Sequence, residues 1–244
     1  NYSFHKHQWS KDQSGELAKT ISLLYPNSSA KNRACIWLAK RAHENGNTNK
    51  AWEYLQEIEN SIRTQEIQGE YLRAKAGLLM ELGNKEKSLH TYQKLLAMDP
   101  QGIPAQKKLN LAILSQKLGK WEWAQNTLQG LWKNREELSA ESQAETLFWL
   151  GEEAQNNGNK QMAKDYYFRL AWKYPKHNMW ALTALHRAAM ICKNQGQLFT
   201  AKNILQKVQK EAVKESQKKQ AQKELSSIRE QIREQQQATG SLLY

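Results

Sequence analysis

The sequence predicts an all-α fold, a solenoid made of a row of antiparallel helix pairs. Its composition is the first observation: Gln, Lys, Ala, Leu and Glu are abundant, and only 4 of the 244 residues are Pro. Such a composition favours helix and leaves little for strands. The second observation is regular punctuation, because five glycines follow one another at intervals of 37, 36, 39 and 38 residues. A fixed period of this size indicates a repeated pair of elements. The glycines are Gly46, Gly83, Gly119, Gly158 and Gly196.

Each glycine stands between small residues at fixed distances. A small residue lies seven places before it and Ala or Ser lies five places after it. We expect the glycine to end the first helix of a pair, because glycine adopts the left-handed cap conformation without penalty. The small residues then allow the two helices to approach closely. The later small positions are Ala51, Ser88, Ala124, Ala163 and Ala201, and Pro100 and Pro175 are predicted to end second helices.

The spacing predicts five helix pairs over residues 30–213, and a length of 244 residues allows either one elongated domain or two compact ones. Their expected bounds are 30–64, 67–101, 104–138, 142–177 and 180–213. Residues 1–29 are predicted to form a tail and a partial repeat or cap helix, since Ser14–Pro26 has the pattern of a lone second helix.

The last segment, residues 214–244, is predicted to be a polar capping helix and tail. Ala221, Leu225, Ile228 and Ile232 form one narrow apolar stripe at helical spacing. A stripe of this kind suits a helix that packs on the last pair and keeps its other faces in water. The alternative is a helix that pairs with another chain.

The order of small residue, glycine, alanine, aromatic or Leu, and proline resembles the tetratricopeptide repeat (TPR) family. The resemblance extends over about residues 30–215 and is strongest in the fourth pair and in residues 83–100. Three features depart from the family pattern: intervals longer than 34 residues, Lys75 in place of Leu, and Glu136 in place of Pro. The resemblance implies a right-handed superhelix whose first helices line a concave groove.

The resemblance also implies which residues face that groove. Apolar positions near its centre and basic positions toward its ends suggest an extended or helical peptide partner of some acidic character. A groove that is only solvated is the alternative. The expected partner-binding residues are Arg33, Ile36, Lys40, Arg73, Leu109, Ile113, Phe148, Glu152, His186, Met190 and Lys193.

Residues 145–189 are similar to bacterial cell-envelope TPR proteins of the outer-membrane assembly lipoprotein and Tol–Pal-associated coordinator types. The similarity rests on "KYP" at residues 173–175 and the short polar link after it. It implies a periplasmic or outer-membrane-associated scaffold, with a cytoplasmic location as the alternative. Because the chain begins at Asn1, we expect a processed or trimmed product; whether a signal peptide or lipid anchor was removed is left open.

The charge of the chain suggests a second class of function. A formal net charge of +12 attracts anionic surfaces, so a basic module that binds an anionic polymer, a lipid surface or nucleic acid is the alternative. Nucleic acid is the weakest of these, because the sequence has no basic block with interleaved aromatics and no zinc-finger or RRM signature. The oligomeric state is left open.

The sequence contains no pattern that favours catalysis. HExxH, paired CxxC, Walker A and Gly-x-Ser-x-Gly motifs are all missing. Glu152 and Glu153 are adjacent, and adjacent positions of a helix face different directions. His5–His7 is a weak metal-binding candidate in a tail. We therefore expect a non-enzymatic protein without a cofactor or a metal.

Cysteines and tryptophans are expected to serve packing. Cys35 and Cys192 lie inside helical apolar patterns, which predicts buried free thiols. Trp37 and Trp149 occupy the same position in their repeats, which favours packing between helices. Five further tryptophans are assigned mainly to the core, with binding anchors as the alternative: Trp121, Trp123, Trp132, Trp172 and Trp180.

Overall fold

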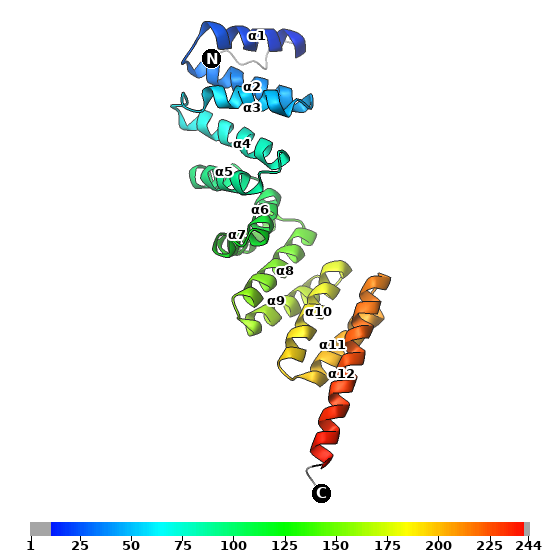
Figure 1. The fold of residues 1–244 in the computed structure, drawn as a ribbon. Helices are drawn as coiled ribbons and strands as arrows, with labels where there is room; N and C mark the ends of the chain where they lie inside the picture. Colours follow the sequence, from blue (N-terminus) through cyan, green and yellow to red (C-terminus); the bar gives the residue numbers. More distant parts are fainter. Residues whose placement is uncertain (1–10, 242–244) are drawn as a thin grey trace. The chain divides into compact units, whose positions relative to one another are not determined.

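The computed structural model describes residues 11–241 and shows an all-α protein (Figure 1). This range contains twelve α-helices, one 3-10 turn at Arg135–Glu137 and no strand, which confirms the predicted fold class. The chain forms two compact bodies, the N-terminal body (residues 1–104) and the C-terminal body (residues 105–244). The metal-binding candidate His5–His7 lies outside the described residues.

The N-terminal body consists of two helix pairs and one preceding helix. Its helices are α1 (Lys11–Leu24), α2 (Ser29–Glu44), α3 (Thr48–Ile58), α4 (Gln65–Glu81) and α5 (Lys85–Met98). Helix α2 pairs with α3 and α4 pairs with α5, while α2 and α3 both contact α4. Helix α1 packs on α2 through Ala18 and Ile21, which lie against Ala34 and Leu38.

The C-terminal body contains three helix pairs and a long last helix. Its helices are α6 (Ala105–Lys117), α7 (Trp121–Lys133), α8 (Ala140–Asn156), α9 (Lys160–Lys173), α10 (Asn178–Asn194), α11 (Leu198–Glu211) and α12 (Glu215–Ser241). Each pair contacts the next in chain order, α7 with α8 and α9 with α10. The core therefore runs along the row of helices as linked clusters rather than as one central nucleus.

The five spaced glycines all adopt the left-handed conformation, with φ between 72° and 76°. At the end of α2, the Gly46 amide donates to the His43 carbonyl at 2.8 Å. The next amide, of Asn47, donates to the Ala42 carbonyl at 2.8 Å. These two bonds satisfy carbonyls that the end of a helix leaves free, and both recur after the other four glycines.

Small residues lie where the paired helices touch. Ala51, Ala124, Ala163 and Ala201 are fully buried. At the same position in the α4–α5 pair, the buried Ser88 hydroxyl donates to the Ala76 carbonyl at 2.7 Å, so its polar group is satisfied.

Helix α12 packs on the last pair, as predicted for a capping helix. Ala221, Leu225 and Ile228 are fully buried in a cluster formed with α10 and α11, and Ile232 packs against its edge. Residues 233–237 are exposed. The narrow apolar stripe thus ends where the helix leaves the neighbouring surface.

Candidate functional site

Helix α10, the first helix of its repeat, leaves one stripe outside the core clusters. On α10, Ala184 and Ala188 face the α8–α9 cluster, and Leu185 and Cys192 face the cluster shared with α11 and α12. Thr183, Arg187 and Met190 belong to neither cluster. We call this stripe, and the stripes at corresponding positions of the other first helices, the groove face of each body. In the C-terminal body its residues are Glu145 and Glu152 on α8 and Thr183, Arg187 and Met190 on α10; in the N-terminal body, described by itself, they are Arg33 and Lys40 on α2 and Glu66, Glu70 and Arg73 on α4.

Ion pairs join neighbouring first helices across the groove face. In the C-terminal body, Glu152 Oε1 accepts from Arg187 Nε at 2.9 Å and from the Tyr167 hydroxyl at 2.7 Å. In the N-terminal body, Arg33 pairs with Glu66 at 2.8 Å. These contacts hold the charged side chains in place between helices.

The prediction of exposed partner contacts is wrong for three residues, because their side chains are buried. Ile36, Leu109 and Phe148 are 1%, 0% and 6% exposed. Phe148 packs among the rings of Trp149 and Trp180, whose centroids lie 5.4 Å and 5.3 Å away. The physical reason is that each first helix packs against its own second helix and against neighbouring repeats, so its apolar surface covers more than one stripe.

The remaining predicted residues keep some accessibility, and their role as partner contacts stays a prediction. Lys40 and Arg73 are exposed, and Ile113, His186 and Met190 are half-buried. Lys193 is also half-buried, but its ammonium group is bound to Glu224 at 2.8 Å and Ser227 at 3.1 Å on α12. Lys193 therefore helps to hold the capping helix.

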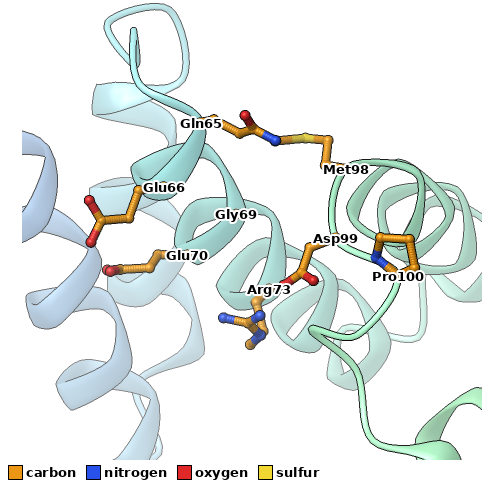
Figure 2. A pocket seen from close by; sticks show the side chains of 8 residues that line it. All are labelled: Gln65, Glu66, Gly69, Glu70, Arg73, Met98, Asp99 and Pro100. Atoms are coloured by element: carbon orange, nitrogen blue, oxygen red, sulfur yellow. The ribbon is translucent and has the colours of Figure 1, made fainter.

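A hollow of about 560 Å³ lies beside the groove face of α4 (Figure 2). Glu66, Glu70 and Asp99 contribute three carboxylates to it, and Arg73 contributes one guanidinium. Arg73 also donates to the Gly102 carbonyl at 3.1 Å. The charge lining this hollow gives no support to the expectation of an acidic partner at this position, because carboxylates repel acidic groups.

A smaller hollow of about 230 Å³ lies between α10, α11 and α12. His186 lines it, and the His186 Nε2 atom is buried without a hydrogen-bond partner. Burial lowers the pKa of His186; Glu224 opposes this effect and Arg187 adds to it. Because the ordinary pKa of histidine is about 6.5, the imidazole is neutral near pH 7.

Other perturbed groups are distributed over the repeats, and three of them meet where the Lys75 ammonium donates to Glu59 and Tyr71. Burial raises the pKa of Glu153, which is held by Asn157, and raises the pKa of Tyr167 strongly. Cys35 and Cys192 are buried free thiols, as predicted, and burial raises the pKa of Cys35 to about 11. Within residues 11–241, no three His, Cys, Asp or Glu side chains are grouped so that they could hold a metal ion. None of the helices in that range has the length and apolarity to cross a membrane.

Family models match two of the five helix pairs. Models of the tetratricopeptide repeat match residues 70–101, over α4 and α5, and residues 145–177, over α8 and α9. These two segments match the tetratricopeptide repeat. Members of the TPR family generally act as non-enzymatic scaffolds for other proteins. A search of curated proteins found no match to the chain.

Solved structures of other proteins share the fold at low sequence identity. The MamA protein is 13% identical with a TM-score of 0.52, and the match covers 82% of this chain and 92% of that chain. PilF of Pseudomonas aeruginosa is 15% identical with a TM-score of 0.51, covering 82% and 84%. MamA from Desulfovibrio magneticus RS-1 is 14% identical with a TM-score of 0.50, covering 81% and 94%. At these identities the likeness extends to the TPR fold alone.

The structure also reveals surface residues that the sequence left ambiguous. Trp172 is 85% exposed, whereas Trp132, Trp149 and Trp180 are partly buried against the core clusters. On α11, Phe199 is 63% exposed. The exposure of Trp172 could have been predicted from its position in the repeat, because the second helix turns one side away from its partner. The residue type alone did not predict it, since tryptophan is usually largely buried.

Proposed function

We propose that the chain is a non-catalytic scaffold that binds a protein partner along the groove face during assembly of a bacterial envelope complex. The observation that carries the proposal is the ordered stripe of Thr183, Arg187 and Met190 beside Glu152. Arg187 and Glu152 are fixed by mutual hydrogen bonds, and Met190 supplies a half-buried apolar surface next to them. Interfaces commonly combine a pre-ordered polar rim with an apolar contact of this kind.

The TPR architecture supports a protein partner in preference to a small substrate. Extended surfaces along stacked repeats suit peptides and protein segments. The perturbed groups Glu59, Tyr71 and Lys75 are bonded to one another, so they form an internal ion-pair network rather than a free acid and base facing a substrate.

The location in the envelope rests on the resemblance of residues 145–189 to envelope TPR proteins. A periplasmic or outer-membrane-associated protein is the proposal, and a cytoplasmic protein is its alternative. The net charge of +12 supports a different function, a basic module on an anionic polymer or lipid surface. The same experiment separates these functions through their response to salt.

The test is affinity capture from an envelope extract with the full chain at low and at raised salt. The groove-face variant is Thr183→Arg/Met190→Ala, which adds bulk and removes the apolar contact. The matched control is Phe199→Ala/Asn203→Arg, on exposed positions of α11. Circular dichroism and thermal unfolding of each variant establish that the fold is kept.

The proposal predicts a discrete partner that the wild type and the control retain at both salt concentrations and that the groove-face variant loses. Capture that disappears for all three proteins at raised salt would instead favour the basic module, because phosphate and polyanion binding weakens steeply with salt.

A further inference from the structure

A second hollow in the N-terminal body lies on the opposite flank of α4 from Glu70 and Arg73. It has a volume of about 680 Å³ and lies between α3 and α5, with the last turns of α4 at its base. Its lining residues are Trp52, Lys75, Leu79, Leu82, Asn84, Glu86, Lys87, His90, Thr91 and Lys94. We call it the outer hollow.

A row of basic side chains on α5 forms one wall of the outer hollow. Lys87, His90 and Lys94 are all exposed and follow one another at helical spacing. At a rise of 1.5 Å per residue, Lys87 and Lys94 lie about 10 Å apart along the helix. Among the described residues, neither ammonium group is within ion-pair distance of a carboxylate. Both are therefore available to an incoming anion.

The opposite wall is aromatic and apolar. The Lys75 ammonium lies 5.8 Å from the centre of the Trp52 ring and is bound to Glu59 and, at 3.0 Å, to Tyr71. Leu82, at the end of α4, is 40% exposed. Lys75 stands where the TPR pattern has Leu, and its ion pair with Glu59 explains how the charge is accommodated. The hollow thus combines free cations on one side with apolar surface on the other.

We propose that the outer hollow binds an acidic peptide segment of a protein partner that also carries one large apolar side chain. The acidic groups pair with Lys87 and Lys94, and the apolar side chain lies against Trp52 and Leu82. An extended peptide of about three residues spans the distance between the two lysines. Charge complementarity of this kind sets specificity and the rate of association.

The mixed charge of the rim favours a peptide over a uniform polyanion. Glu86 lines the hollow and Glu59 borders Lys75, so a chain with a negative charge at every unit would meet repulsion at two points. A peptide can place its carboxylates opposite the lysines and neutral groups opposite the glutamates. This surface is separate from the groove face, and the two proposals can fail independently.

The test begins with selection of peptides from a random library displayed on phage, with the full chain as bait. The best peptide is then synthesised and titrated by fluorescence anisotropy against the wild type, Lys87→Glu/Lys94→Glu and Leu82→Ala. The matched control, Lys207→Glu/Lys210→Glu, makes the same change of charge at exposed positions of α11 outside all three hollows. Heparin, single-stranded DNA and phosphatidylglycerol vesicles serve as competing polyanions and surfaces.

We expect enriched peptides with several Asp or Glu residues and one large apolar residue. Their affinity should fall by about tenfold or more in Lys87→Glu/Lys94→Glu, fall less in Leu82→Ala, and stay unchanged in the control. Selection that yields no such peptides, or peptides that bind the charge-reversed variant equally well, would overturn the proposal. A polyanion or vesicle that binds through Lys87 and Lys94 more tightly than any peptide would also overturn it. Thr183→Arg/Met190→Ala should leave peptide binding intact, which distinguishes this result from failure at the groove face.

Discussion

Gly151 lies in α8 against the buried ring of Tyr167. A Cβ atom at this position would come within 2.4 Å of the ring. We predict that Gly151→Ala lowers the free energy of unfolding by about 1–3 kcal/mol, because an overpacked core must shift its side chains. Urea unfolding measures this change. Gly77→Ala is the control, since a Cβ there meets open space; it should be neutral or stabilise by up to about 1 kcal/mol. Equal effects at both positions would contradict the packing argument.

Phe148 and Met190 were both predicted to bind a partner, but the structure places Phe148 in the core and Met190 at the surface. Phe148 is buried among aromatic rings, whereas Met190 is half-buried and outside the core clusters. Phe148→Ala should lower the free energy of unfolding by about 3–5 kcal/mol. Met190→Ala should cost much less, and should weaken partner binding. Thermal unfolding of the two single variants compares them; a Met190→Ala protein that melts as early as Phe148→Ala would place Met190 in the core.

His186 predicts a dependence of stability on pH. Its pKa in the folded chain is lowered by burial, so the unfolded chain binds the proton more readily. The contribution of the neutral imidazole is complete above the ordinary histidine pKa of about 6.5 and is lost as the pH falls below it. His186→Gln should reduce the loss of stability between about pH 7.5 and about pH 5.5, measured by urea unfolding. Parallel losses in the wild type and the variant would contradict this role.

At the residue scale, the sequence correctly predicted the backbone conformation of the repeat glycines. The five glycines end first helices at positive φ because that conformation is local and is determined by a few neighbours. The prediction of exposed groove-face residues was wrong for Ile36, Leu109 and Phe148. Helical periodicity shows which residues share one side of a helix, but it does not show which side stays in contact with solvent. The pair of Glu152 and Arg187 depends on the register between two helices, which no local pattern records.

Helix α12 is the element whose packing can be tested most simply. Leu225 is fully buried against α10 and α11, and Lys193 binds Glu224 beside it. We predict that Leu225→Ala destabilises this end of the chain by about 2–5 kcal/mol, because the change leaves a cavity. Hydrogen exchange should show loss of protection in α10, α11 and α12.

In the same experiment, the helices of the N-terminal body should keep their protection, since repeats depend mainly on their neighbours. Loss of protection throughout both bodies would contradict a local capping role for α12. The stripe of Ala221, Leu225 and Ile228 made this element predictable, because its spacing differs clearly from its polar surroundings. The exposed end at residues 233–237 carries no comparable signal.

At the scale of the whole molecule, the row of helix pairs followed from the period of the glycines, but the division into two bodies did not. The bodies separate between Pro104 and Ala105, between the second and third predicted pairs, whereas the chain length allowed either one elongated domain or two compact ones. Which pairs form one compact body depends on side chains far apart in the sequence, so periodicity alone does not reveal the boundary. Composition likewise gave the net charge but not the positions of the charged groups. The structure places carboxylates at the groove-face hollow and lysines at the outer hollow.

The most direct test of the account is site-specific photocrosslinking in cells that produce the protein, with p-benzoylphenylalanine in place of Met190 or of Phe199. The account predicts a discrete crosslinked protein from position 190, on the groove face, and none of the same mass from position 199 on α11. A common adduct at both positions, or no adduct at position 190, would contradict a scaffold that binds its partner along the groove face.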